Sequence, residues 1–563
     1  MVQAGDVGHT AGMFTGEQMP LRSKPRSLAA RPHDYVVVGA GSAGSALAAR
    51  LTADPSVTVL LLEAGPRDTK REIGVPAAFS KLFRSDVDWN YDTEPQDRLG
   101  GRRVYWPRGR VLGGSSSINA MMWVRGFSED YDDWGVAAGR GWSWESLSPY
   151  FRRVEGVAPE VLHDDADLAG RQGPVRIEAQ RSPSAHTAAF LRGAADAGHP
   201  VVVGNAADQR GFSQTQVTQH RGARFSAADA YLKPAARRPN LTVVTDAQAT
   251  RVVVENGRAV GVEYAHRGRT EVARARREVA LCGGAVNTPQ LLLLSGIGDR
   301  AELEAHEIPV VAHSPEVGKN LRDHLLSGMA VEATEGTLFD AETPAQLLRY
   351  LARRQGMLTS NVAEAYGFIR SHDGLALPDV ELIFAPVAFV KEGLVAPAGH
   401  ALTLGAILLK PESVGTVSLR SANPFDKPAI DPRYLSDPDG RDRAALLAGL
   451  AECERLLAAP ALRERTTGVY VQPVGGEMLT AAERAEATLV DNAQTLYHPV
   501  GTARMGTDGT SVVDEELRVR GVHGLRVADA SVMPTIIRGH TNAPSIVIGE
   551  KAADLLRGIR HAE

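Results

Sequence analysis

The segment from Asp34 to Pro66, DYVVVGAGSAGSALAARLTADPSVTVLLLEAGP, constrains the fold more than any other part of the chain. Its opening residues, YVVVGA, form a β-branched run typical of a strand buried in a parallel sheet, and SAGSALAARLTAD has the apolar spacing of a helix. VTVLLLE is a second buried strand by the same criterion. The segment therefore predicts a strand, a tight turn, a helix and a second strand, the unit of doubly wound α/β sheets.

The predicted turn carries Gly39, Gly41 and Gly44 in the spacing G-x-G-x-x-G. Glycine lets the backbone turn sharply and approach a pyrophosphate at the positive end of the helix dipole. Glu63 ends the second strand, where an acid can accept hydrogen bonds from a ribose. We predict a dinucleotide site, the alternative being tight packing of an apolar helix. Glu63 argues against NADP, whose 2′-phosphate would meet a like charge, but NAD and FAD both stay open.

Length and composition limit the remaining choices. The 563 residues exceed the ~250 to 300 that one core supports, so we expect two domains. Lys and Arg are spread along a chain of net charge −5, so no basic stripe indicates nucleic acid or an anionic membrane as a partner. Two cysteines, Cys282 and Cys453, are too few for a disulfide framework or a structural zinc site, and no metal site is predicted.

Residues 1–32 have the composition of a flexible leader without the apolar core of a secretory signal. No apolar run approaches the ~20 residues that span a bilayer. We therefore expect a cytoplasmic protein without a transmembrane segment.

A second polar turn lies in YWPRGRVLGGSSSINAMMWVRG, where Gly113 and Gly114 precede three serines. Such a turn offers N–H groups and hydroxyls to a pyrophosphate or a flavin, although it is also typical of an ordinary loop. This segment resembles the first signature of the glucose–methanol–choline (GMC) flavin oxidoreductases, and GGAVNTPQLLLLSGIG (283–298) resembles the second. YHPVGTARMG and LRVADASVMPTIIRGHTNAPSIVIGEKAADLL are similar to the closing segment of that family. The similar segments follow the family's order from about residue 34 to residue 556.

The resemblance implies an α/β fold with two domains. A Rossmann-like FAD-binding domain would comprise residues 33–154, 226–321 and 491–563, and an α+β substrate-binding domain on an antiparallel sheet would comprise 155–225 and 322–490. The strands expected in that sheet include PDVELIFAPVAF, HALTLGAILLK and GTVSLR, and GRDRAALLAGLAECERLLAAP is expected to be a helix that covers it.

FAD rather than NAD follows from the same resemblance. It implies that Val252 lies near the adenine, that Asp529 and Ala530 return to the pyrophosphate and ribityl, and that Asn542 contacts the flavin pyrimidine. Packing is the alternative role for each. Trp106 stands where some relatives carry a histidine bonded to FAD, so we expect non-covalent FAD. The full set of implied cofactor residues is Gly39, Gly41, Ser42, Ala43, Gly44, Glu63, Ala64, Gly113, Gly114, Ser116, Asn119, Ala120, Val252, Asp529, Ala530 and Asn542.

Oxidation of an alcohol by a flavin needs a base for the hydroxyl proton, and neutral histidine suits that task because its ordinary pKa is about 6.5. The resemblance implies that His498 is this base and that His540 is the second catalytic histidine. Placed together, the two rings should titrate as a coupled pair that keeps one base neutral. A structural histidine held in a turn is the alternative for both residues.

Substrate contacts are predicted at Glu364, an acid in the apolar stretch GMLTSNVAEAYGFIRS (356–371), and at Tyr497. A solvated Glu364 is the alternative. A choline site would need an aromatic cage, for which only Tyr497 and Tyr366 are candidates, so a neutral primary or secondary alcohol is favoured. The electron acceptor, oxygen or a quinone-like compound, and the formation of a homo-oligomer stay open.

Three other functions compete with alcohol oxidation. The same flavin scaffold supports hydroxynitrile lyases, which keep the histidine base. An NAD-dependent dehydrogenase would bind the other dinucleotide, and a binding module would have no use for paired histidines.

Overall fold

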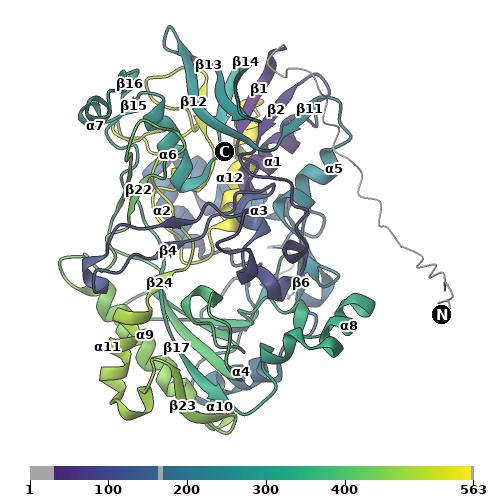
Figure 1. The fold of residues 1–563 in the computed structure, drawn as a ribbon, viewed down its shortest axis with the longest axis vertical. Coiled ribbons are helices and arrows are strands. Elements are labelled where there is room, and N and C mark those ends of the chain that lie inside the picture. Colours follow the sequence, from purple (N-terminus) through teal and green to yellow (C-terminus); the bar gives the residue numbers. More distant parts are fainter. Residues whose placement is uncertain (1–30, 163–168, 560–563) are drawn as a thin grey trace, which may run out of the picture.

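The computed structural model describes residues 31–162 and 169–559, so the predicted leader lies almost wholly outside the described residues. Two sheets dominate the fold, and Figure 1 shows them at opposite ends of the long axis. Helices α1 (Ser42–Leu51) and α12 (Asn542–Leu556) lie beside the first sheet. This α/β architecture with an antiparallel second sheet is the predicted fold class. Among the described residues, no helix is long and apolar enough to cross a membrane.

The first sheet contains the predicted strand–turn–helix–strand unit. Its strands in spatial order are β11 (Leu241–Val244), β2 (Val59–Leu62), β1 (His33–Val38), β14 (Arg269–Leu281), β13 (Arg258–His266) and β12 (Ala247–Glu255), with β25 (Leu525–Val527) paired to β14. The strands β11, β2, β1, β14 and β25 run parallel, whereas β13 pairs antiparallel with both β14 and β12. The parallel strands are buried on both faces, which explains their continuous apolar runs.

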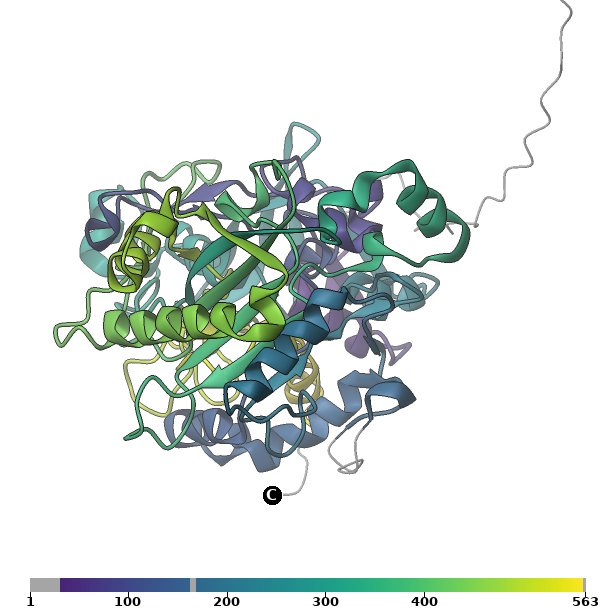
Figure 2. The same cartoon turned by 90° about the horizontal axis from the view of Figure 1, so that it is seen from below.

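The second sheet is antiparallel throughout. Its strands in spatial order are β23 (Thr466–Gln472), β17 (Leu325–Ala333), β20 (Ala401–Leu408), β19 (Val380–Ala385), β18 (Ala365–Ile369) and β7 (Phe212–Gln214), with β24 (Gln494–Thr495) paired to β17. The predicted strands β19 and β20 and the predicted covering helix, α9 (Arg441–Ala458), are confirmed. Figure 2 shows α9 lying across this sheet. The prediction for GTVSLR was wrong, because β21 (Thr416–Ser418) pairs only with β22 (Ala429–Asp431) in a separate two-stranded sheet.

The remaining helices of more than one turn connect the sheets or cover them. They are α1 (Ser42–Leu51), α2 (Ser128–Ala138), α3 (Trp144–Val154), α4 (Ala185–Asp196), α6 (Gly284–Leu294), α7 (Arg300–Ala305), α8 (Pro344–Arg353), α10 (Pro460–Arg463), α11 (Ala481–Asn492) and α12 (Asn542–Leu556).

Each sheet has its own hydrophobic core, but the cores divide the chain differently from the predicted domain boundaries. Val157 and Ile177, predicted in the substrate domain, pack in the core of the first sheet. Tyr91 and Trp106, predicted in the FAD-binding domain, pack in the core of the second. Each core therefore contains segments from both predicted domains, and this exchange of segments holds the two halves of the fold together. The outer limits of the domains stay a prediction.

Helix α12 packs lengthwise on α1 and so brings the end of the chain back to the glycine turn. The contact is close because a Cβ at Gly549 would lie 2.3 Å from the Ala43 carbonyl oxygen. The fully buried Glu550 carboxylate, on α12, binds Arg50 on α1 at 2.8 Å. This packing places the residues that precede α12 beside the N-terminus of α1.

Candidate active site

Two neighbouring cavities lie between the sheets. We call the one lined by Gly39, Gly41 and Glu63 the nucleotide cavity. The other, lined by His498 and His540, is the histidine cavity. Residues that line both cavities are Ser42, Arg108, Ser115, Ala530 and Ser545, so the two form one continuous site.

The structure explains in a different way why each of the three positions in the first turn is a glycine. Gly39 has φ +97°, and a Cβ there would lie 2.3 Å from the Cys282 carbonyl oxygen. A Cβ at Gly44 would lie 1.9 Å from the Gly39 carbonyl oxygen, so this glycine permits the turn to pack on α1. At Gly41 the nearest atom to a Cβ would be 3.9 Å away, and the open side faces the nucleotide cavity. Gly41 is therefore the position at which a ligand can approach the backbone.

Two buried carboxylates brace the walls of the nucleotide cavity. The Glu63 side chain accepts hydrogen bonds from the N–H groups of Ala40 and Gly65, both at 2.9 Å, and burial raises its pKa to about 7. Asp529 accepts from the Gly284 N–H at 2.8 Å, and burial raises its pKa as well. Each carboxylate fixes a turn from which glycine backbone faces the cavity.

The predicted cofactor residues fall into two groups. Those that line the site are Gly39, Gly41, Ser42, Ala43, Glu63, Ala64, Gly114, Asp529 and Ala530 in the nucleotide cavity, and Ser42, Asn119, Ala120, Ala530 and Asn542 in the histidine cavity. Gly44, Gly113, Ser116 and Val252 line neither cavity. A glycine-rich backbone turn joined to carboxylate-braced walls fits an extended dinucleotide that spans both cavities.

The four residues that line neither cavity support the cavity walls instead. The Ser116 hydroxyl donates to the Gly113 carbonyl at 2.6 Å, whereas the neighbouring Ser115 lines both cavities. The Val252 N–H donates to the Ser295 hydroxyl at 2.8 Å in the core, and Ala249 of the same strand lines the nucleotide cavity. We correct the two predicted contacts accordingly, to Ser115 and Ala249. Residues on one strand or turn alternate in direction, so the motif located the segment but not the facing side chain.

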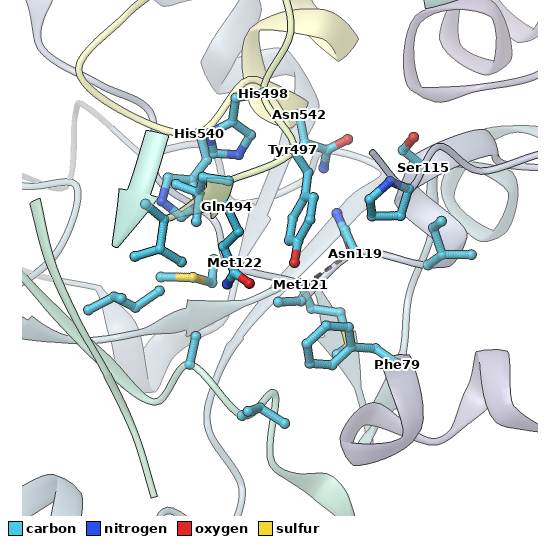
Figure 3. A pocket seen from close by; sticks show the side chains of 18 of the residues that line it. Phe79, Ser115, Asn119, Met121, Met122, Gln494, Tyr497, His498, His540 and Asn542 are labelled. Atoms are coloured by element: carbon cyan, nitrogen blue, oxygen red, sulfur yellow. Dashed lines mark hydrogen bonds between the residues drawn. The ribbon is translucent and has the colours of Figure 1, made fainter. Parts of the chain in front are cut away.

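The two catalytic candidates lie side by side, as Figure 3 shows, with ring centroids 4.7 Å apart. His498 follows β24 of the second sheet, and His540 precedes α12, the helix that packs on α1. Tyr497 holds an unusual backbone conformation, with φ +71°, immediately before His498. Its carbonyl accepts from Arg108 at 2.7 Å and its N–H donates to Thr495 at 2.7 Å, and these bonds hold the strained residue in place.

A third histidine, His324, completes the group and was missed by the sequence reasoning. It is fully buried at the start of β17, and its Nδ1 lies 3.0 Å from Nδ1 of His498. Its Nε2 lies 3.0 Å from the Leu409 carbonyl oxygen, which can only accept. Because burial favours the neutral form of His324, its Nε2 donates to Leu409 and its Nδ1 accepts, so His498 donates from Nδ1. This assignment leaves Nε2 of His498 unprotonated on a ring that lines the cavity.

The surroundings favour neutral rings at His498 and His324. Burial, and then the neighbouring His540, His324 and Arg108, holds the pKa of His498 well below its usual range. Burial and His540 lower the pKa of His324 to about 3. Neutral rings at both positions are the form in which the hydrogen-bond chain from His498 through His324 to Leu409 can exist.

The partner of His540 is a carboxylate. Nε2 of His540 lies 3.1 and 3.2 Å from the two carboxylate oxygens of Glu381, which is fully buried on β19. The carboxylate accepts the Nε2 proton. The two imidazoles therefore have different partners, since His498 contacts another histidine and His540 contacts an acid.

Glu364 does not face the histidine cavity, and the prediction that it contacts substrate was wrong. Its carboxylate is buried and accepts from the Ser184 N–H at 2.7 Å and from the hydroxyls of Thr187 at 2.5 Å and Ser360 at 2.6 Å. Burial raises the pKa of Glu364. Its neighbours Val362 and Ala363 line the cavity instead, so Glu364 anchors the segment that forms this wall.

The wall of the histidine cavity is mostly apolar. Its apolar side chains include Phe79, Phe83, Met121, Met122, Leu326, Val362, Ile383, Phe389 and Leu496. Tyr497 also lines it, as predicted, and packs edge-on against Phe83 at 5.6 Å between centroids. Apart from the histidines, Arg108 is the one ionisable side chain other than a tyrosine among the described residues that line it.

Comparison with known sequences decides the family. Two family models described as GMC oxidoreductase match residues 33–326 and 411–549, which is more than half of the chain. The chain belongs to the GMC oxidoreductase family. It is an FAD-dependent oxidoreductase that acts on CH–OH donors, and the expected choice of FAD over NAD is confirmed.

Relatives of this GMC oxidoreductase match it along almost its whole length. An uncharacterized GMC-type oxidoreductase of Mycobacterium tuberculosis is 58% identical over 93% of this chain and 99% of its own. An alcohol dehydrogenase [acceptor] of Pseudomonas putida is 41% identical over 93% of this chain and 95% of its own. The mitochondrial choline dehydrogenase of Homo sapiens is also 41% identical, over 98% and 95% of the two chains. Because both relatives are 41% identical to this chain, sequence identity does not distinguish an alcohol from choline as the substrate.

The fold of this GMC oxidoreductase is also known from solved structures. The crystal structure of pyridoxine 4-oxidase from Mesorbium loti superposes with a TM-score of 0.84 and 32% identity, over 94% of this chain and 100% of the other.

Proposed function

We propose that this enzyme oxidises a neutral, largely apolar alcohol, with His498 as the base that removes the hydroxyl proton. The observation that carries the proposal is the hydrogen-bond chain from His498 through His324 to the Leu409 carbonyl, because it leaves Nε2 of His498 free to accept a proton. FAD, when bound, accepts a hydride from the alcohol carbon.

The reaction removes one proton from the alcohol oxygen and one hydride from the alcohol carbon. The O–H proton moves to Nε2 of His498 as the C–H bond breaks, and the product is an aldehyde or ketone. Removal of the proton from a weakly acidic alcohol needs a base within hydrogen-bond reach, and the neutral ring meets this need. His540, whose Nε2 donates to the Glu381 carboxylate, can donate from Nδ1 to the substrate oxygen when the ring carries a second proton, and so hold that oxygen in position.

The apolar wall supports the substrate class. A choline cation would need a carboxylate or an aromatic cage at the cavity. Glu364 faces away from the cavity, Glu381 is occupied by His540, and Arg108 contributes a positive charge. A carbon chain or ring, in contrast, would contact the phenylalanine and methionine side chains of the wall. We therefore favour an uncharged aliphatic or aromatic alcohol over choline.

An anaerobic screen tests the proposal against its alternatives. Neutral primary alcohols of increasing chain length, aromatic alcohols and choline are each added to the yellow holoenzyme without oxygen, and the loss of flavin absorbance is followed. Bleaching by apolar alcohols supports the proposal, and faster bleaching by choline contradicts the substrate class. Cleavage of a cyanohydrin without bleaching by any alcohol would indicate the hydroxynitrile lyase reaction instead. Reoxidation by oxygen or by a quinone then identifies the acceptor.

Substitution of His324 tests its part in orienting the base. His324→Leu removes the acceptor for the His498 Nδ1 proton, so the neutral ring can carry its proton on either nitrogen. We expect flavin reduction to slow by roughly 10- to 100-fold, a positioning effect smaller than loss of the base itself. His324→Gln restores an acceptor and should recover part of the rate. Equal rates for the two variants, at equal FAD content, would argue that His324 only fills space.

The pH dependence follows from the lowered pKa of His498. An ordinary histidine would gain a proton and lose its function as the pH falls through about 6.5. Because the pKa of His498 is lowered, its neutral form persists to lower pH, and the reduction rate should stay nearly constant between about pH 8 and pH 6. Stopped-flow measurement of flavin reduction across this range checks the prediction. An acid limb centred near 6.5 would contradict the neutral base assigned here.

A further inference from the structure

Helix α8 (Pro344–Arg353) exposes its leucines to solvent. Leu347, Leu348 and Leu351 are 48%, 69% and 64% exposed, whereas Tyr350 is the buried side chain of the helix. Positions 347, 348 and 351 lie on one side of a helix with 3.6 residues per turn. An amphipathic surface helix ordinarily turns its leucines toward the core, so the orientation here is reversed. We call these three leucines, with the neighbouring Phe339, which is 43% exposed, the α8 face.

The side of α8 away from the leucines, and its C-terminal end, carry arginines. Arg349, Arg353 and Arg354 are all exposed, and residues 344–354 contain no Asp or Glu. The nearest acids in the chain precede the helix and already have partners, since Glu342 binds Lys81 at 2.5 Å and Asp340 lies 4.0 Å from His400. A short helix with leucines on one side and arginines on the opposite, polar side matches the helices that lie in the interface of anionic membranes. The net charge of −5 conceals this local cluster.

Helix α8 packs on the segment that continues into the wall of the histidine cavity. The Tyr350 hydroxyl donates to the Gly74 carbonyl at 3.0 Å, and Tyr350 packs in a small core with Val75 and Ala77. The same segment continues into Phe79, which lines the cavity. Figures 1 and 2 both show α8 projecting from the body of the molecule. A surface bound to α8 would therefore lie next to residues 74–79, which lead into the wall of the histidine cavity.

The size of the α8 face separates a lipid surface from a second copy of the chain. Three partly exposed leucines and one phenylalanine amount to a few hundred Å² of apolar surface. A standard protein interface buries about 800 Å² from each partner, polar area included, which exceeds the area of the α8 face. Insertion of a few leucines among acyl chains, aided by arginines at the headgroups, needs no such area, because each apolar group and each cation contributes separately.

We propose that the α8 face docks this enzyme onto an anionic lipid surface, with the leucines entering the acyl boundary and Arg349, Arg353 and Arg354 contacting the headgroups. The enzyme would bind such a surface peripherally and reversibly. The proposal is independent of the base and the substrate proposed above, because docking is measured without turnover.

Sedimentation of the FAD-loaded enzyme with vesicles tests the proposal. Vesicles of phosphatidylcholine alone are compared with vesicles that contain phosphatidylglycerol. Wild-type enzyme should sediment with the anionic vesicles and only weakly with the neutral ones. Leu348→Ser/Leu351→Ser should reduce binding at least ~10-fold. Arg349→Gln/Arg353→Gln should reduce it by about fivefold for each arginine and abolish the preference for phosphatidylglycerol.

A matched control substitutes exposed apolar residues elsewhere. Val474 and Met478, 91% and 83% exposed, lie far from α8 in the sequence, and Val474→Ser/Met478→Ser should bind vesicles as the wild type does. All variants should keep FAD and the rate of reduction by a water-soluble alcohol, because α8 lines neither cavity. Unchanged binding by the leucine variant, or equal loss in the control, would overturn the proposal. A dimer in light scattering that the leucine variant dissociates would assign the face to self-association instead.

Discussion

His498→Ala is expected to slow the reduction of bound FAD by an alcohol by a factor of at least ~10², the usual contribution of a positioned base. The effect should be this large because Nε2 of His498 is the nitrogen that the hydrogen-bond chain leaves free to accept the proton. Single-turnover flavin reduction without oxygen measures the step directly.

Two controls separate loss of the base from other damage. His372→Ala removes an exposed histidine on a loop of the second sheet and should leave the rate unchanged. The FAD content of His498→Ala, read from the ratio of flavin to protein absorbance, should match the wild type, since His498 lines the histidine cavity and not the glycine turn. A rate within threefold of the wild type at full FAD content would remove His498 from the role of base.

Gly41→Ala is expected to weaken FAD binding by roughly 10- to 100-fold, the range of the steric cost of an added methyl group in a filled site. The protein itself has room for this methyl group, because its nearest neighbour would be 3.9 Å away. The backbone also permits alanine, with φ −75° and ψ −161°. The variant should therefore fold normally, yet the methyl group would occupy the space where a pyrophosphate approaches the turn. Titration of the apoprotein with FAD gives the affinity.

Gly399→Ala is the matched control for this substitution, because no atom lies within 4 Å of a Cβ at that position. It should bind FAD as the wild type does. Thermal unfolding of both apoproteins should show similar midpoints, which would separate a filled cavity from a damaged fold. Full affinity in Gly41→Ala would show that the cofactor does not approach this turn.

The sequence predicted the parts of the fold that depend on local pattern. Spacing of apolar residues predicted β1, α1 and β2, and the glycine spacing predicted the turn between them. Pattern failed at GTVSLR, because the partner of a short strand depends on residues distant in the sequence. It also failed at Ser116 and Val252, where a neighbour within the same segment faces the cavity. Local spacing identifies a segment, whereas packing selects the side of it that faces a ligand.

The histidine group shows what tertiary structure alone decided. The motifs indicated His498 and His540, but no spacing in the sequence links them to His324 or Glu381, which lie 174 and 159 residues away from their respective partners. The two halves of the fold bring these four side chains together, and only then does the orientation of each ring follow from its hydrogen bonds.

The sequence also did not predict that the leucines of α8 face solvent. A helical pattern shows which residues share a face but not whether another element covers that face. The sequence by itself therefore determined the cofactor and the family and indicated two candidate catalytic residues, since these depend on residue types at fixed local spacing. Which ring is free to accept a proton, and which apolar face stays open, were decided by contacts between distant segments.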